Sequence, residues 1–175
     1  MRIHLADISE CDGRIEEYSL PFEMSELLYQ GNSYPVKESA PVQIKVENTG
    51  NHVLKICVEA SITVILPCDR CLEDVDRAIP VSFSHEYDMK QTAEERIRDL
   101  DESSYLNGTD LDVDRMVYLE LLMNWPQKIL CRENCKGLCP ICGKNLNYGD
   151  CGCEEEPKDP RMAAISDIFS KFKEV

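Results

Sequence analysis

The pattern of apolar and polar residues predicts mostly β-strands in the first half of the chain. The stretch Asn-Thr-Gly-Asn at 48–51 predicts a tight turn between two of these strands. We therefore predict an antiparallel β-sheet over residues 1 to 90, either open or curled into a partly closed barrel. Apolar side chains alternate with polar ones, as in half-buried strands, over residues 1–8, 15–20, 42–46, 54–66 and 75–89.

Helical spacing of apolar residues predicts a helix over residues 111–124 that packs on the sheet, with Pro126 shortly after its end. A shorter helix is predicted within residues 21–32, ended by Gly31, and a last helix after Asp159-Pro160, an N-cap followed by proline. Strands and helices together predict an α+β fold. The residues expected on the inward side of the helix over 111–124 are Val113, Met116, Val117, Leu121 and Leu122.

The cysteine distribution divides the chain, since six of the ten cysteines lie between Cys131 and Cys153. We predict a β-rich body over residues 1–126, which includes the helix near 111–124. A cysteine-rich zinc-knuckle module with a C-terminal helix follows over residues 127–175. The run Cys-Pro-Ile-Cys-Gly at 139–143 supports the knuckle, because two thiolates, a rigid proline and a glycine that tolerates positive φ let the backbone curl round one metal ion.

Eight cysteines form four closely spaced pairs, Cys68/Cys71, Cys131/Cys135, Cys139/Cys142 and Cys151/Cys153. Four thiolates complete the shell of a structural zinc ion and leave no position open for catalysis, so we predict one or two structural Zn²⁺ ions. A sequential assignment places the first two pairs at one ion and the last two at another. A cross-brace instead joins the first pair to the third, and a third alternative fills only the C-terminal site.

The pair Cys68/Cys71 lies between two predicted strands, at the tip of a long hairpin. A redox dithiol of the thioredoxin type would stand between a strand and a helix, so metal binding is the favoured interpretation, with redox chemistry or two ordinary thiols as alternatives. Cys11 and Cys57 are left over and are expected to act as small apolar side chains.

The formal net charge of −14 argues against a protein that coats nucleic acid without selectivity, because such binding depends on a basic surface. Residues 124–149 differ locally, with four bases against the single acid Glu133. These bases are candidates for contacts with phosphate, or they offset the charge of nearby thiolates. The candidate nucleic-acid-binding residues are Lys128, Arg132, Lys136 and Lys144.

The chain shows neither a signal-peptide pattern nor an apolar run of membrane-spanning length, so we expect a cytoplasmic protein without a membrane partner. In a reducing compartment closely spaced cysteines favour metal over disulfides. A Ser/His/Asp arrangement, a carboxylate pair and a phosphate-binding loop are all missing from the sequence, which predicts neither an enzyme nor a small-molecule substrate.

Several motifs together resemble the bacterial YceD family, the large ribosomal RNA subunit accumulation proteins. They are CDRCLEDV at 68–75, LDVDRMVYLELLMNWP at 111–126, CRENCKGLCPICGKNLNYGDCGC at 131–153 and EEEPKDPRMAAISDI at 154–168. The resemblance implies a cytoplasmic factor in large-subunit ribosome biogenesis, needed for 23S ribosomal RNA to accumulate. It also implies metal binding by all eight paired cysteines, Cys68, Cys71, Cys131, Cys135, Cys139, Cys142, Cys151 and Cys153.

We therefore expect a non-enzymatic metal-binding factor that contacts ribosomal RNA or a large-subunit ribosomal protein. One alternative is an acidic carrier that shields a basic ribosomal protein, since the chain is strongly acidic. Another is a thiol-disulfide redox protein that acts through Cys68 and Cys71. The sequence leaves the oligomeric state open.

Overall fold

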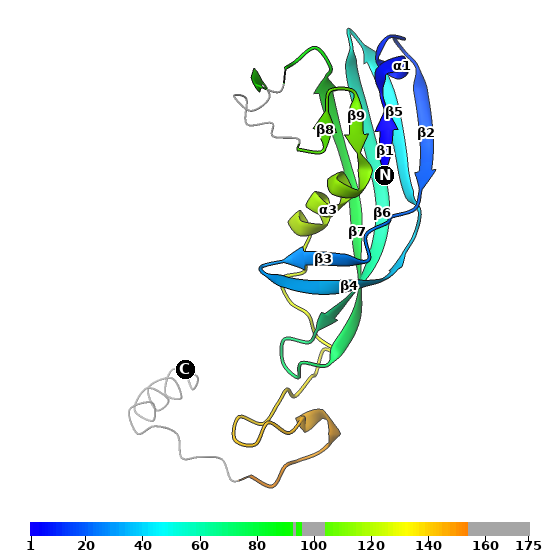
Figure 1. Cartoon of the computed structure of the whole chain (residues 1–175). Coiled ribbons are helices and arrows are strands. Elements are labelled where there is room, and N and C mark those ends of the chain that lie inside the picture. The colour runs from blue at the N-terminus through cyan, green and yellow to red at the C-terminus, as the bar shows by residue number, and fades with distance from the viewer. Residues whose placement is uncertain (93, 96–103, 154–175) are drawn as a thin grey trace, which may run out of the picture. The chain divides into compact units, whose positions relative to one another are not determined.

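The computed structural model describes residues 1–92, 94–95 and 104–153 (Figure 1). The fold is α+β, mostly antiparallel sheet with one main helix, as predicted. The chain forms two compact units, Met1–Glu133 and Asn134–Val175. The predicted assignment of residues 1–126 and 127–175 to separate domains stays a prediction, and the predicted C-terminal helix lies outside the described residues.

Six strands form one antiparallel sheet in the order β2-β5-β6-β4-β3, and β7 pairs with the opposite edge of β6. Strands β1, β9 and β8 form a second, smaller sheet. In chain order the elements are β1 Arg2–His4, α1 Ala6–Ser9, β2 Ile15–Leu20, β3 Glu26–Tyr29, β4 Asn32–Ser39, β5 Val42–Gly50, β6 Val53–Pro67, β7 Asp74–Asp88, β8 Leu106–Asn107, β9 Asp110–Asp112, α3 Val113–Met123 and the 3-10 turn η1 Leu146–Tyr148.

The hairpin of β6 and β7 is the longest feature of the large sheet, paired from Val53↔Asp88 to Pro67↔Asp74. Alternate side chains of β6 are buried, as the period of two in the sequence predicts. The hairpin therefore carries Cys68 and Cys71 at the end where β6 leads into β7, which confirms the predicted hairpin tip. The buried residues of β6 are Leu54, Ile56, Val58, Ile62, Val64 and Leu66.

Helix α3 confirms the helix predicted over 111–124, although β9 takes the first two of those positions. Asp112 is its N-cap, and the Asp112 carboxylate accepts a hydrogen bond from the backbone N–H of Arg115 at 3.1 Å. The buried side is formed by Val113, Met116, Val117 and Leu121, whereas Leu122 is half-buried.

Two local predictions are wrong. The helix predicted within residues 21–32 is absent, because β3 and β4 pair across a two-residue turn in which Gln30 and Gly31 both have positive φ, +49° and +81°. Positive φ at both central positions is the turn that suits the twist of a hairpin. The strand predicted over residues 1–8 is shorter than expected, since the chain turns into α1 after β1.

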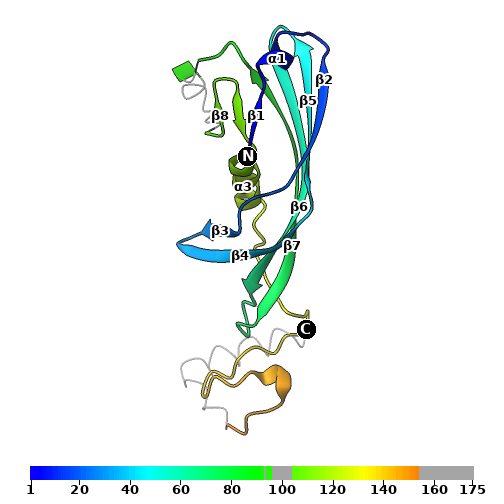
Figure 2. The same ribbon diagram turned by 45° about the vertical axis from the view of Figure 1, so that its right-hand side comes forward.

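The large sheet is open, so the predicted partly closed barrel is wrong. Within the described chain β2 pairs with β5 alone, β3 with β4 alone and β7 with β6 alone, so these edge strands do not meet one another. Helix α3 and the small sheet instead cover one face of the large sheet (Figures 1 and 2). Their buried side chains share one hydrophobic core with the sheet, so the core is completed without closure.

Candidate metal centre

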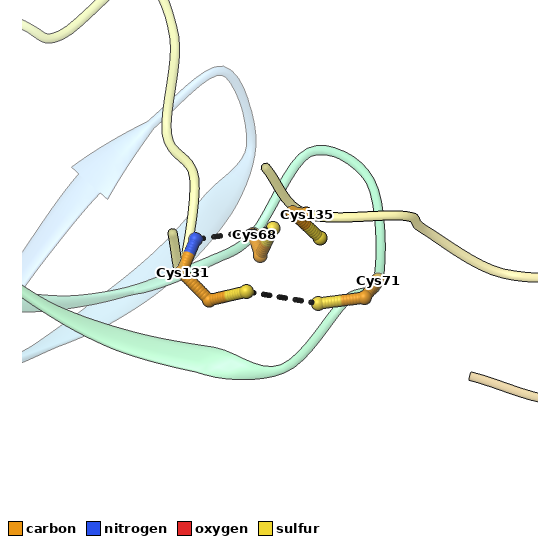
Figure 3. A group of neighbouring side chains, drawn as sticks. All are labelled: Cys68, Cys71, Cys131 and Cys135. Atoms are coloured by element: carbon orange, nitrogen blue, oxygen red, sulfur yellow. Dashed lines mark hydrogen bonds between the residues drawn. The ribbon is translucent and has the colours of Figure 1, made fainter. Parts of the chain in front are cut away.

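The first cysteine group brings together Cys68, Cys71, Cys131 and Cys135 (Figure 3). Their four sulfur atoms all lie within 4.8 Å of one another. Cys68, Cys71 and Cys135 are buried and Cys131 is half-buried. The sulfur atoms of Cys71 and Cys131 lie 3.5 Å apart, well beyond the length of a disulfide bond.

The hairpin loop is shaped by its own backbone hydrogen bonds. The N–H of Cys68 donates to the carbonyl of Glu73 at 2.8 Å, and the N–H of Leu72 donates to the carbonyl of Cys68 at 2.9 Å. These bonds fold residues 68–73 into a tight loop, so that both cysteine side chains lie on the loop's inner side.

Asp69 fixes the segment after α3 beside this loop. Its backbone N–H donates to the carbonyl of Ile129 at 2.8 Å, and its carboxylate accepts from the N–H of Ile129 at 2.6 Å. Two residues further on, the N–H of Cys131 donates to the sulfur of Cys68 at 3.4 Å. The paired bonds of Asp69 thus bring Cys131 to the hairpin cysteines from a position 63 residues away in the sequence.

The thiol of Cys68 is held in a setting that favours its ionised form. Burial disfavours the thiolate, but hydrogen bonds from the backbone N–H groups of Arg70, Cys71 and Cys131 outweigh this effect and lower the pKa of Cys68 to about 6. The thiolate is the form of cysteine that binds metal, so the loop prepares this side chain as a ligand.

The second group brings together Cys139, Cys142, Cys151 and Cys153, whose sulfur atoms also lie within 4.8 Å of one another. The N–H of Cys139 donates to the carbonyl of Lys144 at 2.8 Å. This group is more exposed than the first: Cys139 is buried, Cys142 is exposed and the other two are half-buried.

The thiols of the second group differ in their tendency to ionise. Hydrogen bonds from the backbone N–H groups of Cys142 and Ile141 lower the pKa of Cys139 to about 6. Cys153 forms hydrogen bonds with the sulfur atoms of Cys142 and Cys151, and these bonds raise the pKa of Cys153 to about 12. The surroundings thus favour the thiolate at Cys139 and the neutral thiol at Cys153, and a metal ion bound by all four sulfurs would displace the proton of Cys153.

The grouping of sulfur atoms corresponds to the sequential assignment of the four pairs and not to the cross-brace. The two groups could each hold a metal ion, and ligation by these eight residues stays a prediction. The pair Cys68/Cys71 stands between antiparallel strands, which differs from the strand-to-helix position of thioredoxin-like dithiols. Cys11 is exposed, and Cys57 is half-buried with its sulfur 3.3 Å from the hydroxyl of Ser84.

Asn147 is a supporting residue that the sequence analysis missed. Its side-chain N–H₂ donates to the sulfur of Cys135 at 3.2 Å, and its side-chain oxygen accepts from the backbone N–H of Lys136 at 2.9 Å. Such second-layer hydrogen bonds orient a metal-binding sulfur. Asp69 was missed in the same way, and its position between two cysteines is the only signal in the sequence that could have pointed to it.

The four predicted nucleic-acid-binding residues, Lys128, Arg132, Lys136 and Lys144, are all exposed. Lys128 and Arg132 belong to the first unit, and Lys136 and Lys144 to the second. The Nζ of Lys144 donates to the carbonyl of Asp150 at 2.9 Å, so this base also supports its own loop. A role for the four residues in binding RNA stays a prediction.

Trp125 and Tyr148, two aromatic residues that lie near the bases in the sequence, differ in their surroundings. The ring of Trp125 stacks on Tyr29, with 4.4 Å between ring centroids and 25° between planes, and it also contacts Tyr34. Trp125 is thus half-buried and packs against the hydrophobic core, and one face of its indole is covered by Tyr29. Tyr148 is 75% exposed in the second unit.

The family described as large ribosomal RNA subunit accumulation protein YceD matches residues 56–169, which include both cysteine groups and α3. The chain belongs to the YceD family. The description of the YceD family connects it with accumulation of large-subunit ribosomal RNA, and the family is not known as a family of enzymes.

Curated relatives include proteins of Mycobacterium tuberculosis and Mycobacterium bovis, each described as uncharacterized. Each is 27% identical to this chain over 128 residues, which is 73% of this chain and 61% of the relative. The chain thus spans about three-fifths of the length of these relatives. A search of solved structures gives no match. Among the described residues, the helices are all too short or too polar to cross a membrane.

Proposed function

We propose that this chain is a non-enzymatic, zinc-binding factor of large ribosomal subunit biogenesis in the cytoplasm, which supports accumulation of 23S ribosomal RNA. The observation that carries the proposal is the gathering of eight cysteines into two four-sulfur groups in a chain of the YceD family. Membership of the YceD family supports the role in ribosome biogenesis. The two sulfur groups support the proposal that metal ions stabilise the loops that carry out this role.

The donor set and its spacing support zinc. Tetrahedral Zn²⁺ with Zn–S bonds of about 2.3 Å places its sulfur atoms about 3.8 Å apart, and the sulfur atoms of each group lie within 4.8 Å of one another. Four thiolates fill such a shell, so the ion would hold the loops and offer no open position to a substrate. The first ion would be held by Cys68, Cys71, Cys131 and Cys135, and the second by Cys139, Cys142, Cys151 and Cys153.

The metal would contribute to stability more than closing the loops costs. Doubling the length of a closed loop costs about 0.6 kcal/mol, whereas structural zinc contributes on the order of 10 kcal/mol. Binding of the first ion would therefore fix the tip of the β6–β7 hairpin against the segment that follows α3.

Contact with ribosomal RNA is proposed for the four exposed bases, Lys128, Arg132, Lys136 and Lys144. Each base that meets a phosphate releases counterions, so binding would weaken as salt rises. The exposed ring of Tyr148 can add stacking on an unpaired base. If substitution of all four bases by Glu leaves RNA affinity and its salt dependence unchanged, this contact is wrong.

A protein partner is the second candidate, favoured by the net charge of −14. An acidic chain attracts a basic ribosomal protein at low salt. Thiol-disulfide exchange is disfavoured, because Cys68 and Cys71 are buried and a substrate disulfide must reach the attacking thiolate.

The proposed role is tested in cells that lack the gene for this chain, by the ratio of 23S to 16S ribosomal RNA. Wild-type chain should restore the ratio, and the variants Cys68→Ser/Cys71→Ser and Cys139→Ser/Cys142→Ser should restore it poorly. Cys57→Ser, outside both groups, is the matched control and should behave as wild type. Full restoration by both double variants would contradict a functional role for the metal.

A further inference from the structure

The two C-x-x-C loops share one backbone geometry. In the first loop the N–H of Leu72 donates to the carbonyl of Cys68 at 2.9 Å, and in the second the N–H of Gly143 donates to the carbonyl of Cys139 at the same distance. The residue after the second cysteine is left-handed in both, with φ of +60° at Leu72 and +72° at Gly143. Leu72 and Gly143 are therefore equivalent positions.

A leucine is an unusual choice for this position. Left-handed backbone brings the Cβ atom of an L-residue close to the following carbonyl oxygen, and glycine avoids this cost because it has no Cβ atom. The left-handed backbone is therefore unstrained at Gly143 and strained at Leu72. Backbone strain of this kind is retained where surrounding structure enforces it, and often where a function needs the side chain.

Burial within the unit does not compensate for the strain, because Leu72 is 66% exposed. A single exposed leucine is ordinary on a protein surface. A leucine that is both strained and exposed, at a position where glycine fits without strain, is not explained by packing in the described chain, and a contact with a partner would account for it.

The loop presents this side chain rigidly. The N–H of Leu72 is bonded to Cys68, and the N–H of Cys68 closes the loop on Glu73 at 2.8 Å. Asp69 holds the loop to Ile129 through two further bonds. A side chain fixed in this way loses little conformational freedom on binding, which favours its use as an anchor.

We propose that Leu72 is the apolar anchor of a docking surface at the β6–β7 hairpin tip, and that its partner is a protein with an apolar pocket bordered by basic side chains. This inference rests on the proposed function, since the partner would be a protein component of the precursor large subunit. The surface is formed by the exposed and half-buried residues of 69–74, which comprise the loop and the first residue of β7, at the end of the hairpin where β6 and β7 meet (Figure 1).

The charge of the loop favours a protein over RNA. Asp69, Glu73 and Asp74 outnumber Arg70, so residues 69–74 have a net charge of −2, which repels phosphate. Leucine also lacks the flat π-face on which an unpaired base stacks. Acidic groups around an apolar anchor instead complement a pocket with a basic rim.

The test compares wild type and Leu72→Gly, each as the full zinc-loaded chain, in binding to purified precursor large-subunit particles and to protein-free RNA from the same particles. Burial of a leucine predicts that Leu72→Gly binds the particles about tenfold more weakly. Its affinity for the RNA should equal that of wild type. Its zinc content should match wild type and its melting temperature should be equal or higher, because glycine removes the strain.

Two further variants test whether the effect comes from the apolar side chain of Leu72. In Leu72→Asn the new residue tolerates left-handed backbone but has no apolar side chain. This variant should therefore bind the particles as weakly as Leu72→Gly. Leu28→Ala is the matched control, because Leu28 is a leucine of similar exposure, 62%, on β3, and this variant should bind as wild type.

The opposite results are distinct. Unchanged particle binding by Leu72→Gly would overturn the docking surface, and so would loss of zinc or a lower melting temperature, which would show that leucine has a structural role. Equal weakening on protein-free RNA would make the partner RNA and overturn the inference. Wild-type chain that binds neither particles nor RNA would contradict the proposed function itself, and the docking partner with it.

Discussion

Asn48 is a buried polar side chain, 1% exposed, that joins three parts of the chain. Its side-chain N–H₂ donates to the carbonyls of Ile8 and Ser9 at 2.8 and 3.0 Å, and its side-chain oxygen accepts from the N–H of Gly50 at 2.9 Å. Two of these bonds go to the last carbonyls of α1, of which that of Ile8 also accepts from the backbone N–H of Cys11 at 3.4 Å.

We expect Asn48→Ala to lower the free energy of unfolding by about 1–3 kcal/mol, because it removes the hydrogen bonds of a buried amide to the carbonyls of Ile8 and Ser9 and to the N–H of Gly50. Gln43→Ala, on the exposed side of the same strand, is the control and should change stability by about 0.5 kcal/mol at most. Urea denaturation measures both. Equal stability of Asn48→Ala and wild type would show that water replaces the lost amide.

Tyr18 gives the stability a dependence on alkaline pH. Burial raises the pKa of Tyr18 to about 12, and a hydrogen bond from its hydroxyl to the Glu16 carboxylate adds to the effect. In the unfolded chain a tyrosine ionises near pH 10. The stabilisation by the neutral phenol is thus complete below about pH 10 and is lost as the pH rises toward about 12.

The matched variant Tyr18→Phe keeps the ring but has no group to ionise. Between about pH 9 and pH 11.5, wild type should lose about 1 kcal/mol more unfolding free energy than Tyr18→Phe, a value reduced for the partial exposure of the phenol. Chemical denaturation at the two pH values gives the difference. Parallel loss in both proteins would contradict the assignment.

At the scale of elements, the two cysteine loops differ in access to solvent. Cys68, Cys71 and Cys135 are at most 4% exposed, whereas Cys142 is exposed and Cys151 and Cys153 are half-buried. A chelator or alkylating reagent reaches a sulfur atom only when it is accessible.

We therefore expect a zinc chelator with N-ethylmaleimide to modify the cysteines of the second group before those of the first, with one metal equivalent released in a fast phase. The second equivalent should leave slowly, together with modification of the first group. Mass spectrometry of the modified peptides and a colorimetric zinc assay follow the two events. Release in one phase, or modification of Cys68 and Cys71 first, would contradict the difference in access.

The sequence predicted the elements whose pattern is long and regular. Alternation over residues 54–66 and helical spacing over 111–124 gave β6 and α3 with small errors at the ends. The prediction of a helix within residues 21–32 was wrong, because Leu27 and Leu28 fit both the helical and the strand spacing. Gln30 also gives no signal in the sequence of its left-handed backbone. Pairing with β4 decides its structure, and that is a tertiary effect.

For the candidate site, spacing was enough to name all eight cysteines but not their supports. Asp69 and Asn147 act through bonds to Ile129 and Cys135, which are distant in sequence, so only the fold reveals them. Leu72 is informative only once its φ is known, since an exposed leucine carries no signal by itself.

For the whole molecule, the account depends on two metal ions that join separate stretches of chain. Cys131 reaches Cys68 across 63 residues, and this arrangement places a rigid hairpin tip beside the segment after α3. Four close sulfur atoms with a thiolate among them are open to oxidation when no metal is bound, so this geometry favours an ion as the element that holds them.

The most direct test of this central claim is the zinc content of the purified full chain, measured by elemental analysis. We expect two equivalents per chain, in line with the two sulfur groups. Cys71→Ser/Cys131→Ser should retain one equivalent because both residues belong to the same group, whereas Cys71→Ser/Cys142→Ser should retain none. A wild-type chain without zinc, or a Cys71→Ser/Cys131→Ser variant that loses both equivalents, would contradict the account.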